Sequence, residues 1–359
     1  MLIFIDTNIF FRNWKLKNAD FSFLFNFITN ENGVLLLSEL VVSEIESIRN
    51  RELEASKLQL EKCIKSIDSM CESPLKIDIS AITKSYSFKD ILAQKLDPEF
   101  IRYIDYSSIS QEVVVRRAMD RVRPFKEGEK GYRDTLIWLS LLNYLSVNEI
   151  KENVAFISNN SDDFLNSRKT DFHADLIKDI EAIKLNCSII PYSSLFNFID
   201  KNVDKNEHLI AHSELDEIED LIEEYTIDYL NNWSTEELKI SLHSSYPQIS
   251  SLLSIDDHEF IIDEGMEDGT IESKEHIKGR IVYVSYNYNL RICTLKITIS
   301  REEYNRVQYT LPIWHNVEEL GEDYSQIEIY CRIYLSSSFE YDMENKTIDG
   351  FSVNRIGYR

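Results

Sequence analysis

Residues 1–200 alternate short, uninterrupted apolar runs with segments whose apolar residues recur at helical spacing. The apolar runs lie in MLIFI, GVLLLS, NVAFISNN and CSIIPYS, and the helical patterns lie in FSFLFNFI, ELVVSEIESIRNRELEASKLQLEKCIKSIDSM, YSSISQEVVVRRAMDRV, GYRDTLIWLSLLNYLS and TDFHADLIKDIEAIKL. Strands that are apolar throughout are typical of a parallel sheet that helices cover on both faces. This part of the chain is therefore predicted to be an α/β domain with a central parallel sheet.

The pattern changes in the second half of the chain. A polar segment, KNVDKNEHLIAHSELDEIED, leads into an acidic helical stretch, and from about residue 258 apolar and polar residues alternate, as in GRIVYVSYNYNLRICTLKITIS, NRVQYTLPIW and SQIEIYCRIYLSSSFEYD. Alternation with a period of two is typical of antiparallel strands. We therefore expect an α/β domain over residues 1–205 and a smaller α+β domain, mainly antiparallel β, over residues 206–359.

The negative charge of the chain is concentrated in the second of these domains. The net formal charge is −23; residues 206–359 hold 31 acids and 12 bases, whereas residues 1–205 hold 31 acids and 27 bases. A strongly acidic surface disfavours nucleic acid, and this argument applies mainly to residues 206–359. For that domain we expect substrate or partner selection, through protein binding or through electrostatic mimicry of nucleic acid.

Composition also bears on the cellular setting. No apolar run reaches the length of a membrane span, and Met1 leads straight into an apolar strand without the basic region and cleavage site of a signal peptide. The five cysteines are scattered and form no CxxC pair, so disulfides are not expected. These features predict a cytoplasmic protein without a membrane partner, and they leave open whether it forms a homo-oligomer.

Acidic residues directly follow several of the predicted strands. Asp6 follows the run LIFI, Asp134 begins an apolar helical segment shortly after a glycine, and the strand in NVAFIS opens into NNSDDF, which contains Asp162 and Asp163. Each has an ordinary explanation, because Asp, Asn and Ser cap helices and form turns. The alternative is a set of metal ligands at the carboxyl ends of parallel strands, where open α/β sheets place their sites.

The strand-to-helix transitions that carry these acids are expected to converge on one edge of the sheet. Carboxylates gathered there raise one another's pKa unless a cation compensates their charge. Mg²⁺ and Mn²⁺ prefer oxygen ligands and take few direct carboxylates, while other groups bind through water or orient the ligands. Such a site suits phosphodiester hydrolysis, because the ion polarises a phosphoryl oxygen and stabilises the leaving oxygen.

A further acid follows the second predicted strand. In LLLSELVVSEIESI, Glu44 lies about two turns into a helix and Glu46 faces a different side, so only one of them can point back over the strand ends. Glu39 lies in the first turn of the same helix, where an acid simply complements the helix dipole. Glu44 is therefore a candidate for the same acidic site.

Taken together, these segments resemble a PIN domain, a metal-dependent nuclease fold. The matching pieces are IDTNIF, SELVVSEI, GYRDTLIW and FISNNSDDF, and in this order they cover about residues 1–195. RPF followed by GYRDTLIW, SNNSDDF and FHADL resembles the DUF4935-type subfamily of larger bacterial proteins. The resemblance implies an α/β/α sandwich, Mg²⁺ or Mn²⁺ as cofactor, and endonucleolytic hydrolysis of single-stranded RNA, often in a toxin or phage-defence setting.

The resemblance also assigns residues to the site. Asp6, Glu44 and Asp134 match the first three acids of the family. Many members carry the fourth acid at the position of Asn160, so that Asp163 becomes the best candidate in this chain. The candidate metal ligands are Asp6, Glu44, Asp134, Asp162 and Asp163, all of which except Asp162 are also candidate catalytic residues, and the candidates for orienting them are Asn8, Ser158 and Asn160.

A basic stretch leads directly into Asp134. Contacts of Arg and Lys with phosphates supply most of the affinity of proteins for nucleic acid, and Tyr132 or Phe125 could stack on unpaired bases. The alternatives are a solvated helix face for the basic residues and core packing for Phe125. The candidate nucleic-acid-binding residues are Arg116, Arg117, Arg121, Arg123, Lys126, Lys130 and Arg133.

Two other functions stay open at the level of the sequence. One is a structure-specific nuclease that acts on DNA. The other is a catalytically degenerate PIN fold that serves as a binding module, and it is favoured by Asn160, which stands where many family members have an acid.

Overall fold

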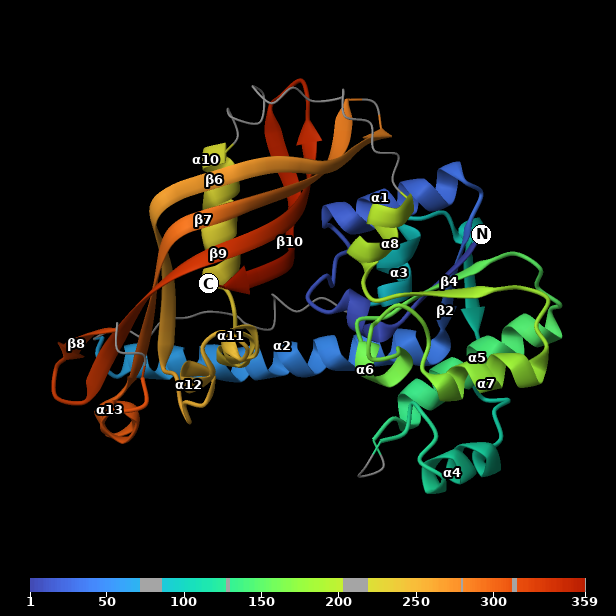
Figure 1. Ribbon diagram of the computed structural model, residues 1–359, viewed down its shortest axis with the longest axis horizontal. Helices are drawn as coiled ribbons and strands as arrows, with labels where there is room; N and C mark the ends of the chain where they lie inside the picture. The colour runs from blue at the N-terminus through green and yellow to red at the C-terminus, as the bar shows by residue number, and fades with distance from the viewer. Residues whose placement is uncertain (72–85, 127–129, 203–218, 279, 312–314, 359) are drawn as a thin grey trace. The chain divides into compact units, whose positions relative to one another are not determined.

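The computed structural model describes residues 1–71, 86–126, 130–202, 219–278, 280–311 and 315–358. The chain divides into two compact units, which Figure 1 shows in one view. The first unit comprises Met1–Lys17 and Leu24–Lys201, and the second comprises Asn18–Phe23 and Asn202–Arg359. The predicted domain boundary near residue 205 lies outside the described residues.

Five parallel strands form the sheet of the first unit, in the order β3-β2-β1-β4-β5. They are β1 (Leu2–Ile5), β2 (Val34–Ser38), β3 (Ile101–Ile104), β4 (Val154–Ile157) and β5 (Ile189–Tyr192). Every residue of β1 and β4 is buried, as expected of strands that are covered on both faces. The parallel sheet predicted from the apolar runs is thus confirmed.

Helices cover both faces of this sheet (Figure 1). α1 and α8 lie on one face, where Phe27 and Phe198 meet edge to face at 5.5 Å, while α5 and α7 lie on the other, where Trp138 packs against Phe156 of β4. The helices are α1 (Ala19–Asn30), α2 (Glu39–Asp68), α3 (Phe88–Ala93), α4 (Gln111–Met119), α5 (Tyr132–Val147), α6 (Ser161–Phe164), α7 (Ala174–Ile183) and α8 (Leu195–Asn202), with the 3-10 helices η1 (Thr7–Phe10) and η3 (Pro98–Phe100).

The strand order reverses between β1 and β4. From β1 the chain proceeds through β2 to β3 at one edge, and it then returns to β4 and β5 on the other side of β1. Connections that leave two neighbouring strands in opposite directions open a crevice at their carboxyl ends, where α/β sheets bind ligands. The residues that follow these two strands, Asp6 and Ser158, stand at this crevice.

The second unit is a curved antiparallel sheet that packs on helices (Figure 1). Its strand order is β10-β9-β7-β6, with β8 paired to β9, and alternate residues of β9 from Ile327 to Ile333 join a core with Ile222 and Leu230 of α10. The mainly antiparallel second domain is thus confirmed. Its elements are α10 (Glu219–Asn231), α11 (Thr235–Leu242), α12 (Pro247–Ser250), β6 (Asp257–Lys278), β7 (Ile281–Ser300), α13 (Arg301–Val307), β8 (Asn316–Leu320), β9 (Tyr324–Asp342) and β10 (Thr347–Tyr358).

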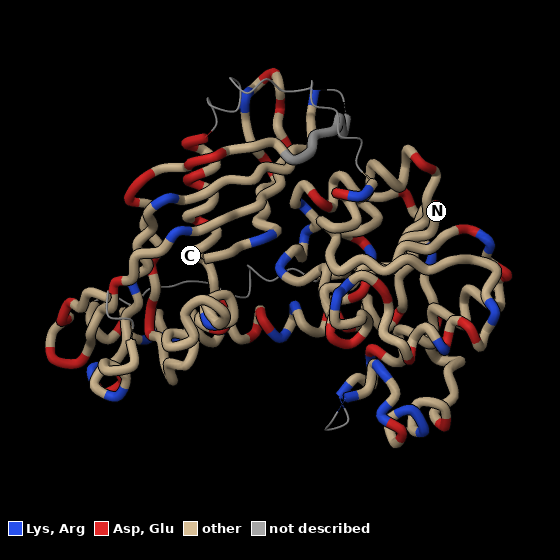
Figure 2. The backbone as a smooth tube through the Cα atoms, viewed as in Figure 1, with Lys and Arg blue, Asp and Glu red and all other residues tan. Residues whose placement is uncertain are grey.

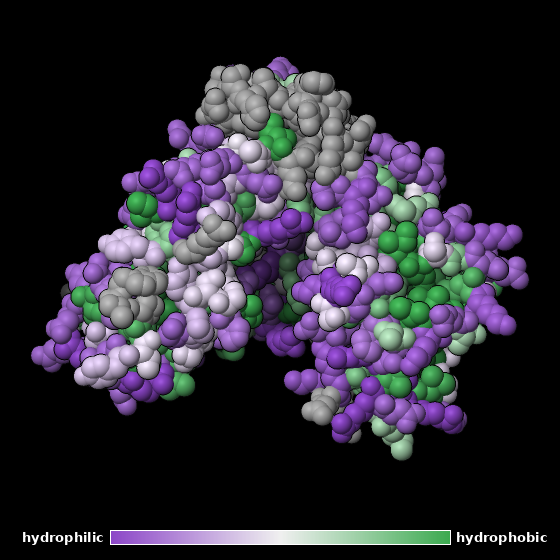
Figure 3. All heavy atoms as spheres, viewed as in Figure 1, coloured by the Kyte–Doolittle hydropathy of each residue, from purple (hydrophilic) through white to green (hydrophobic). Residues whose placement is uncertain are grey.

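The visible surface of each unit is mainly hydrophilic (Figure 3). In the part of the chain that the structure describes, no helix is both long and apolar enough to cross a membrane. Lys and Arg residues gather around α4 and the segment that follows it (Figure 2). The basic stretch noted in the sequence is therefore also a local concentration of positive charge in space.

Candidate functional site

Asp6 follows β1 directly, and it is both a helix cap and one corner of an acidic cluster. Its Oδ1 accepts a hydrogen bond from the Thr7 backbone N–H at 2.7 Å, as the N-cap of η1. Its Oδ2 accepts hydrogen bonds from Ser158 Oγ at 2.7 Å and from Asn8 Nδ2 at 2.9 Å. Because only 2% of Asp6 is exposed, these three donors fix both carboxylate oxygens.

Burial raises the pKa of Asp6 from its ordinary value of 3.8 to about 7. Hydrogen bonds from Ser158 and Thr7 lower this pKa, whereas the nearby charges of Asp134 and Glu44 raise it. The negative charge on Asp6 is therefore poorly tolerated despite its donors. A cation placed among these carboxylates would offset their mutual repulsion.

Glu44 reaches the same place from the second turn of α2. Its Oε2 accepts a hydrogen bond from Thr7 Oγ1 at 2.7 Å. The neighbouring acids are turned elsewhere, since Glu39 forms an ion pair with Lys89 at 2.9 Å and Glu46 accepts a backbone N–H at the start of α3 at 2.8 Å. Of the three acids in this helical segment, Glu44 is the one that meets the residues after β1.

Asp134 lies in the first turn of α5, whose N-cap position is taken by Gly131. Gly131 has a φ of +107°, and a Cβ there would come within 2.3 Å of the Pro124 carbonyl oxygen, so glycine is required. Burial raises the pKa of Asp134, and the charges of Asp163 and Glu44 raise it further. Asp134 is therefore not the N-cap residue and shares an electrostatic environment with two other predicted acids.

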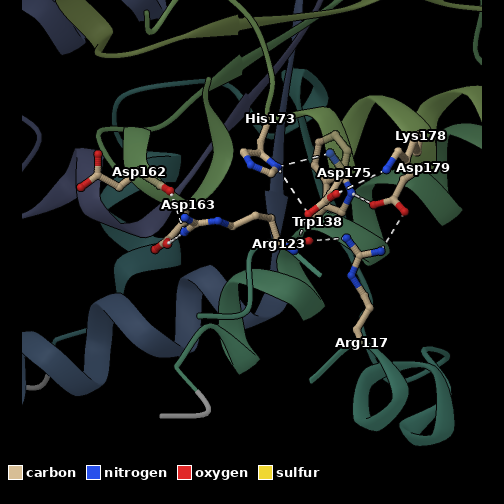
Figure 4. Close-up of polar contacts among 9 residues, drawn as sticks. All are labelled: Arg117, Arg123, Trp138, Asp162, Asp163, His173, Asp175, Lys178 and Asp179. Carbon is tan, nitrogen blue, oxygen red and sulfur yellow. Dashed lines mark hydrogen bonds and ion pairs between the residues drawn. The ribbon is translucent and has the colours of Figure 1, made fainter. Parts of the chain in front are cut away.

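The last two candidate acids lie in the single-turn helix α6, which follows β4. Its N-cap residue, Asn160, donates its backbone N–H to Ser158 Oγ at 3.1 Å. The Asn160 Nδ2 donates to Asp163 Oδ2 at 2.5 Å and to Asp134 Oδ1 at 3.3 Å. Asp163 is 8% exposed, whereas Asp162 is exposed and points away from it (Figure 4). The structure thus turns Asp163, and not Asp162, toward the other acids.

Three small polar residues connect the four acids. The links run from Glu44 through Thr7 to Asp6, and from Asp6 through Ser158 and Asn160 to Asp134 and Asp163. Thr7 is absent from the residues predicted for the site. Its hydroxyl matters because it contacts Glu44, which lies 37 residues further along the chain. The motif DTN by itself gave no signal of this contact.

The donor set of the cluster suits a hard divalent ion. All of these side chains offer oxygen, and the buried Asp163 Oδ1 accepts no hydrogen bond from the described residues. Cations stand there instead: Lys126 Nζ forms an ion pair with Asp163, Arg123 Nη1 lies 3.5 Å from the same oxygen, and Arg133 pairs with Glu44. As the described residues are placed, no three His, Cys, Asp or Glu side chains enclose a metal position.

The cations come from the basic stretch that runs from α4 into the first turn of α5. Part of this stretch lines an open hollow of about 550 Å³, whose lining residues are Arg121, Arg123, Phe125, Lys126 and Lys130. Phe125 is 3% exposed and packs with Val114 and Leu136, whereas Tyr132 is 48% exposed. The hollow therefore combines a buried aromatic floor with four cationic side chains.

Two acids of α7 hold the beginning of the basic stretch (Figure 4). Asp179 accepts hydrogen bonds from Arg117 Nη1 at 2.8 Å and from Trp138 Nε1 at 2.9 Å, and Asp175 accepts the Arg123 backbone N–H at 3.2 Å. Arg117 also donates to the Arg123 carbonyl oxygen and is only 9% exposed. The guanidinium of Arg117 therefore fixes the backbone that carries Arg123 and does not face solvent.

The remaining predicted basic residues lie at the surface. The Arg116 side chain is 72% exposed and forms an ion pair with Glu112 at 2.9 Å within α4. The Arg133 side chain is 62% exposed, although its guanidinium contacts the largely buried Glu44. Arg116 and Arg133 thus add to the exposed positive charge of the basic stretch.

The open parallel sheet of the first unit brings four carboxylates together where its strand order reverses, and a basic hollow lies beside them. This is the arrangement of a nuclease-type α/β domain. In a comparison with protein families, residues 3–164 match the PIN domain. The N-terminal part of the chain is a PIN domain, and the members of this family are generally nucleases that use divalent metal ions. No curated protein and no solved structure matches the chain.

Proposed function

We propose that the PIN domain of this chain is a divalent-metal-dependent endoribonuclease that cleaves single-stranded RNA. The observation that carries the proposal is the hydrogen-bonded connection of Asp6, Glu44, Asp134 and Asp163 at the carboxyl ends of the central strands. The raised pKa values of Asp6 and Asp134 support a role for a cation there, because a cation would favour the ionised carboxylates.

The ion would be Mg²⁺ or Mn²⁺, and the carboxylates of Asp6, Glu44, Asp134 and Asp163 would hold it, with Asp162 at the surface nearby. When bound, such an ion supplies Lewis-acid stabilisation of the charge that develops on the phosphate and on the leaving oxygen. Asn8 and Ser158 orient Asp6 by donating to its Oδ2. Asn160 orients the carboxylates of Asp134 and Asp163 in the same way.

The basic stretch would bind the phosphates of the RNA. Arg121, Arg123, Lys126 and Lys130 meet in one hollow, where they can contact consecutive phosphates of a bound strand. Arg116 and Arg133 extend this surface, and Arg117 contributes by holding the backbone of Arg123. The exposed ring of Tyr132 offers a face on which an unpaired base can stack, which favours single strands over duplexes.

The direct test is incubation of the purified chain with single-stranded RNA in Mn²⁺ or in EDTA. We expect cleavage only with the ion, loss of cleavage in Asp163→Asn, and retained cleavage in Asp162→Asn, because Asp162 is exposed and turned away. Absence of metal-dependent cleavage, or undiminished cleavage by Asp6→Asn, would contradict the proposal. DNA flaps assayed beside RNA distinguish a structure-specific DNA nuclease.

A binding module without catalysis is the second candidate function. It is favoured by the amide of Asn160 at the family's acidic position and by the ion pairs that Lys126 and Arg133 form with the acids. Calorimetric titration with Mn²⁺ separates the two functions. Unmeasurable Mn²⁺ binding by a folded protein that still binds RNA would support the binding module.

For the acidic second unit we propose selection of a substrate or protein partner, without direct RNA contact. The exposed side of α10 is rich in acids, among them Asp220, Glu224 and Asp228, and such a surface repels a polyanion. RNA affinity should survive deletion of residues 206–359, and its complete loss with the PIN domain still folded would contradict this. A cytoplasmic location, a toxin or phage-defence setting and the DUF4935-type subfamily stay predictions, and the formation of a homo-oligomer stays open.

A further inference from the structure

One short segment places two of its cations on two of the four site acids. Lys126 Nζ contacts Asp163 Oδ1, and Arg133 Nη1 contacts Glu44 Oε1. The side chains of Asp163 and Glu44 are only 11% and 13% exposed, whereas those of Lys126 and Arg133 are 35% and 62% exposed. The acids are therefore held within the domain, while the cations reach them from the solvent side.

The same carboxylate oxygens are the ones that a divalent ion would need. A carboxylate oxygen in direct contact with an ammonium or guanidinium group binds a metal ion less strongly. The cationic group and the metal ion compete for the same negative charge and the same lone pairs. We propose that Lys126 and Arg133 are internal counter-cations that compete with the divalent ion and, once displaced by it, bind the phosphates of the nucleic acid. This proposal rests on the function proposed above and adds the regulation of its site.

Lys126 also lines the basic hollow, where a displaced side chain could meet a phosphate. Lys126 forms part of the hollow together with Arg121, Arg123 and Lys130, so rotation of its side chain alone suffices to leave Asp163. The backbone on either side is fixed, because Arg117 and Asp175 hold Arg123 and the Lys126 backbone N–H donates to the Lys130 carbonyl at 2.9 Å. The exchange therefore needs no movement of the backbone at Arg123 or Lys126.

Competition at the acids makes ion binding and phosphate binding cooperative. When the divalent ion binds, Lys126 and Arg133 lose their acidic partners and become available to a polyanion. Because coupling between two ligands is reciprocal, the polyanion must strengthen ion binding by the same factor. Metal ion and RNA would thus each strengthen the binding of the other.

Calorimetry of the full chain with Mn²⁺ tests the competition. Lys126→Met removes the closer of two cations at Asp163 and leaves Arg123 Nη1 at 3.5 Å from the same oxygen. The change should tighten Mn²⁺ binding by about two- to fivefold, the range that partly exposed ion pairs support. Lys130→Met is the matched control, because Lys130 lines the same hollow and its side chain makes no ion pair with another described residue. Its Mn²⁺ affinity should equal that of the wild type, and Lys126→Arg should restore wild-type affinity.

Fluorescence anisotropy with a short single-stranded oligodeoxynucleotide, with and without Mn²⁺, tests the coupling. Mn²⁺ should tighten oligonucleotide binding in the wild type and in Lys130→Met, and by a smaller factor in Lys126→Met. Equal Mn²⁺ affinities of wild type and Lys126→Met, with metal-dependent RNA cleavage intact, would overturn this inference and leave the proposed function standing. Absence of both Mn²⁺ binding and metal-dependent cleavage in the wild type would overturn both.

Discussion

Asn160 donates its side-chain amide to Asp163 Oδ2 over 2.5 Å. The same Nδ2 lies 3.3 Å from Asp134 Oδ1, so that one neutral side chain bridges two carboxylates that repel each other. An acid in this place could only accept hydrogen bonds when ionised. The amide therefore holds the two carboxylates together in a way that a third carboxylate could not.

Asn160→Asp should destabilise the protein in EDTA and make its stability depend on a divalent ion. The change replaces a donor by a like charge next to Asp134 and Asp163, at a cost of about 1–3 kcal/mol. Thermal unfolding should show a lower Tm in EDTA and a larger rise of Tm with Mn²⁺ than in the wild type. Asn159→Asp, at an exposed neighbouring position, is the control, and an equal response of the two variants would contradict the expectation.

Ser158→Ala should lower both stability and activity. Its hydroxyl donates to Asp6 Oδ2 and accepts the Asn160 N–H, so its removal leaves a buried carboxylate and a partly buried amide short of a partner, which costs about 2 kcal/mol. Urea unfolding measures the loss. Ser188→Ala removes a hydroxyl that donates to the exposed Asn153 and should change the free energy of unfolding little. Equal losses in the two variants would show that Ser158 has no special role.

The raised pKa of Asp6 gives the protein in EDTA a definite pH dependence. Because burial raises this pKa from 3.8 to about 7, the folded state binds the proton more tightly than the unfolded state. The free energy of unfolding should therefore rise as the pH falls from about 7 toward about 4, by a few kcal/mol at most. Urea unfolding of wild type and Asp6→Asn at several pH values measures this rise. The same pH dependence in both proteins would rule out Asp6 as its source.

Gly131→Ala should disturb the start of α5. An added Cβ would meet the Pro124 carbonyl oxygen at 2.3 Å, in addition to the strain of a φ of +107°. Gly321→Ala is the matched control, because Gly321 also has a positive φ, of +70°, but its added Cβ meets no described atom within 4 Å. Strain alone costs roughly 1 kcal/mol, and the clash should make the loss at Gly131 clearly larger in urea unfolding. Similar losses at the two positions would contradict this.

The apolar runs predicted the sheet well, with one omission. Four of the five strands of the first unit coincide with runs that are apolar nearly throughout, and such runs have few alternatives in a folded domain. The strand that escaped prediction is β3, with the sequence IRYI. It lies at the sheet edge, where only Ile101 and Ile104 are buried and Arg102 is exposed, so it lacks the pattern of a strand covered on both faces.

Site residues that directly follow a strand were predictable from the sequence. Residues on helices were less predictable, because the direction of their side chains depends on how the helix is rotated about its axis. The position of Asp6 follows from the end of β1 alone. The choice between Glu44 and Glu46 depends on Thr7 and on the start of α3, which the sequence of the helix does not contain. The burial of Arg117 depends in the same way on Asp179, 62 residues further along the chain.

The residues of the acidic cluster are translated far apart in time, which determines when the cluster can form. The Asp6 backbone N–H donates to the Ile157 carbonyl at 3.0 Å, and the hydroxyl that fixes the Asp6 carboxylate comes 152 residues later in the chain. A growing chain on the ribosome that already contains β1, β2 and α2 still lacks these partners. The acidic cluster can therefore assemble only after translation has passed β4 and α6, so that a nascent chain ending before these elements lacks the complete cluster.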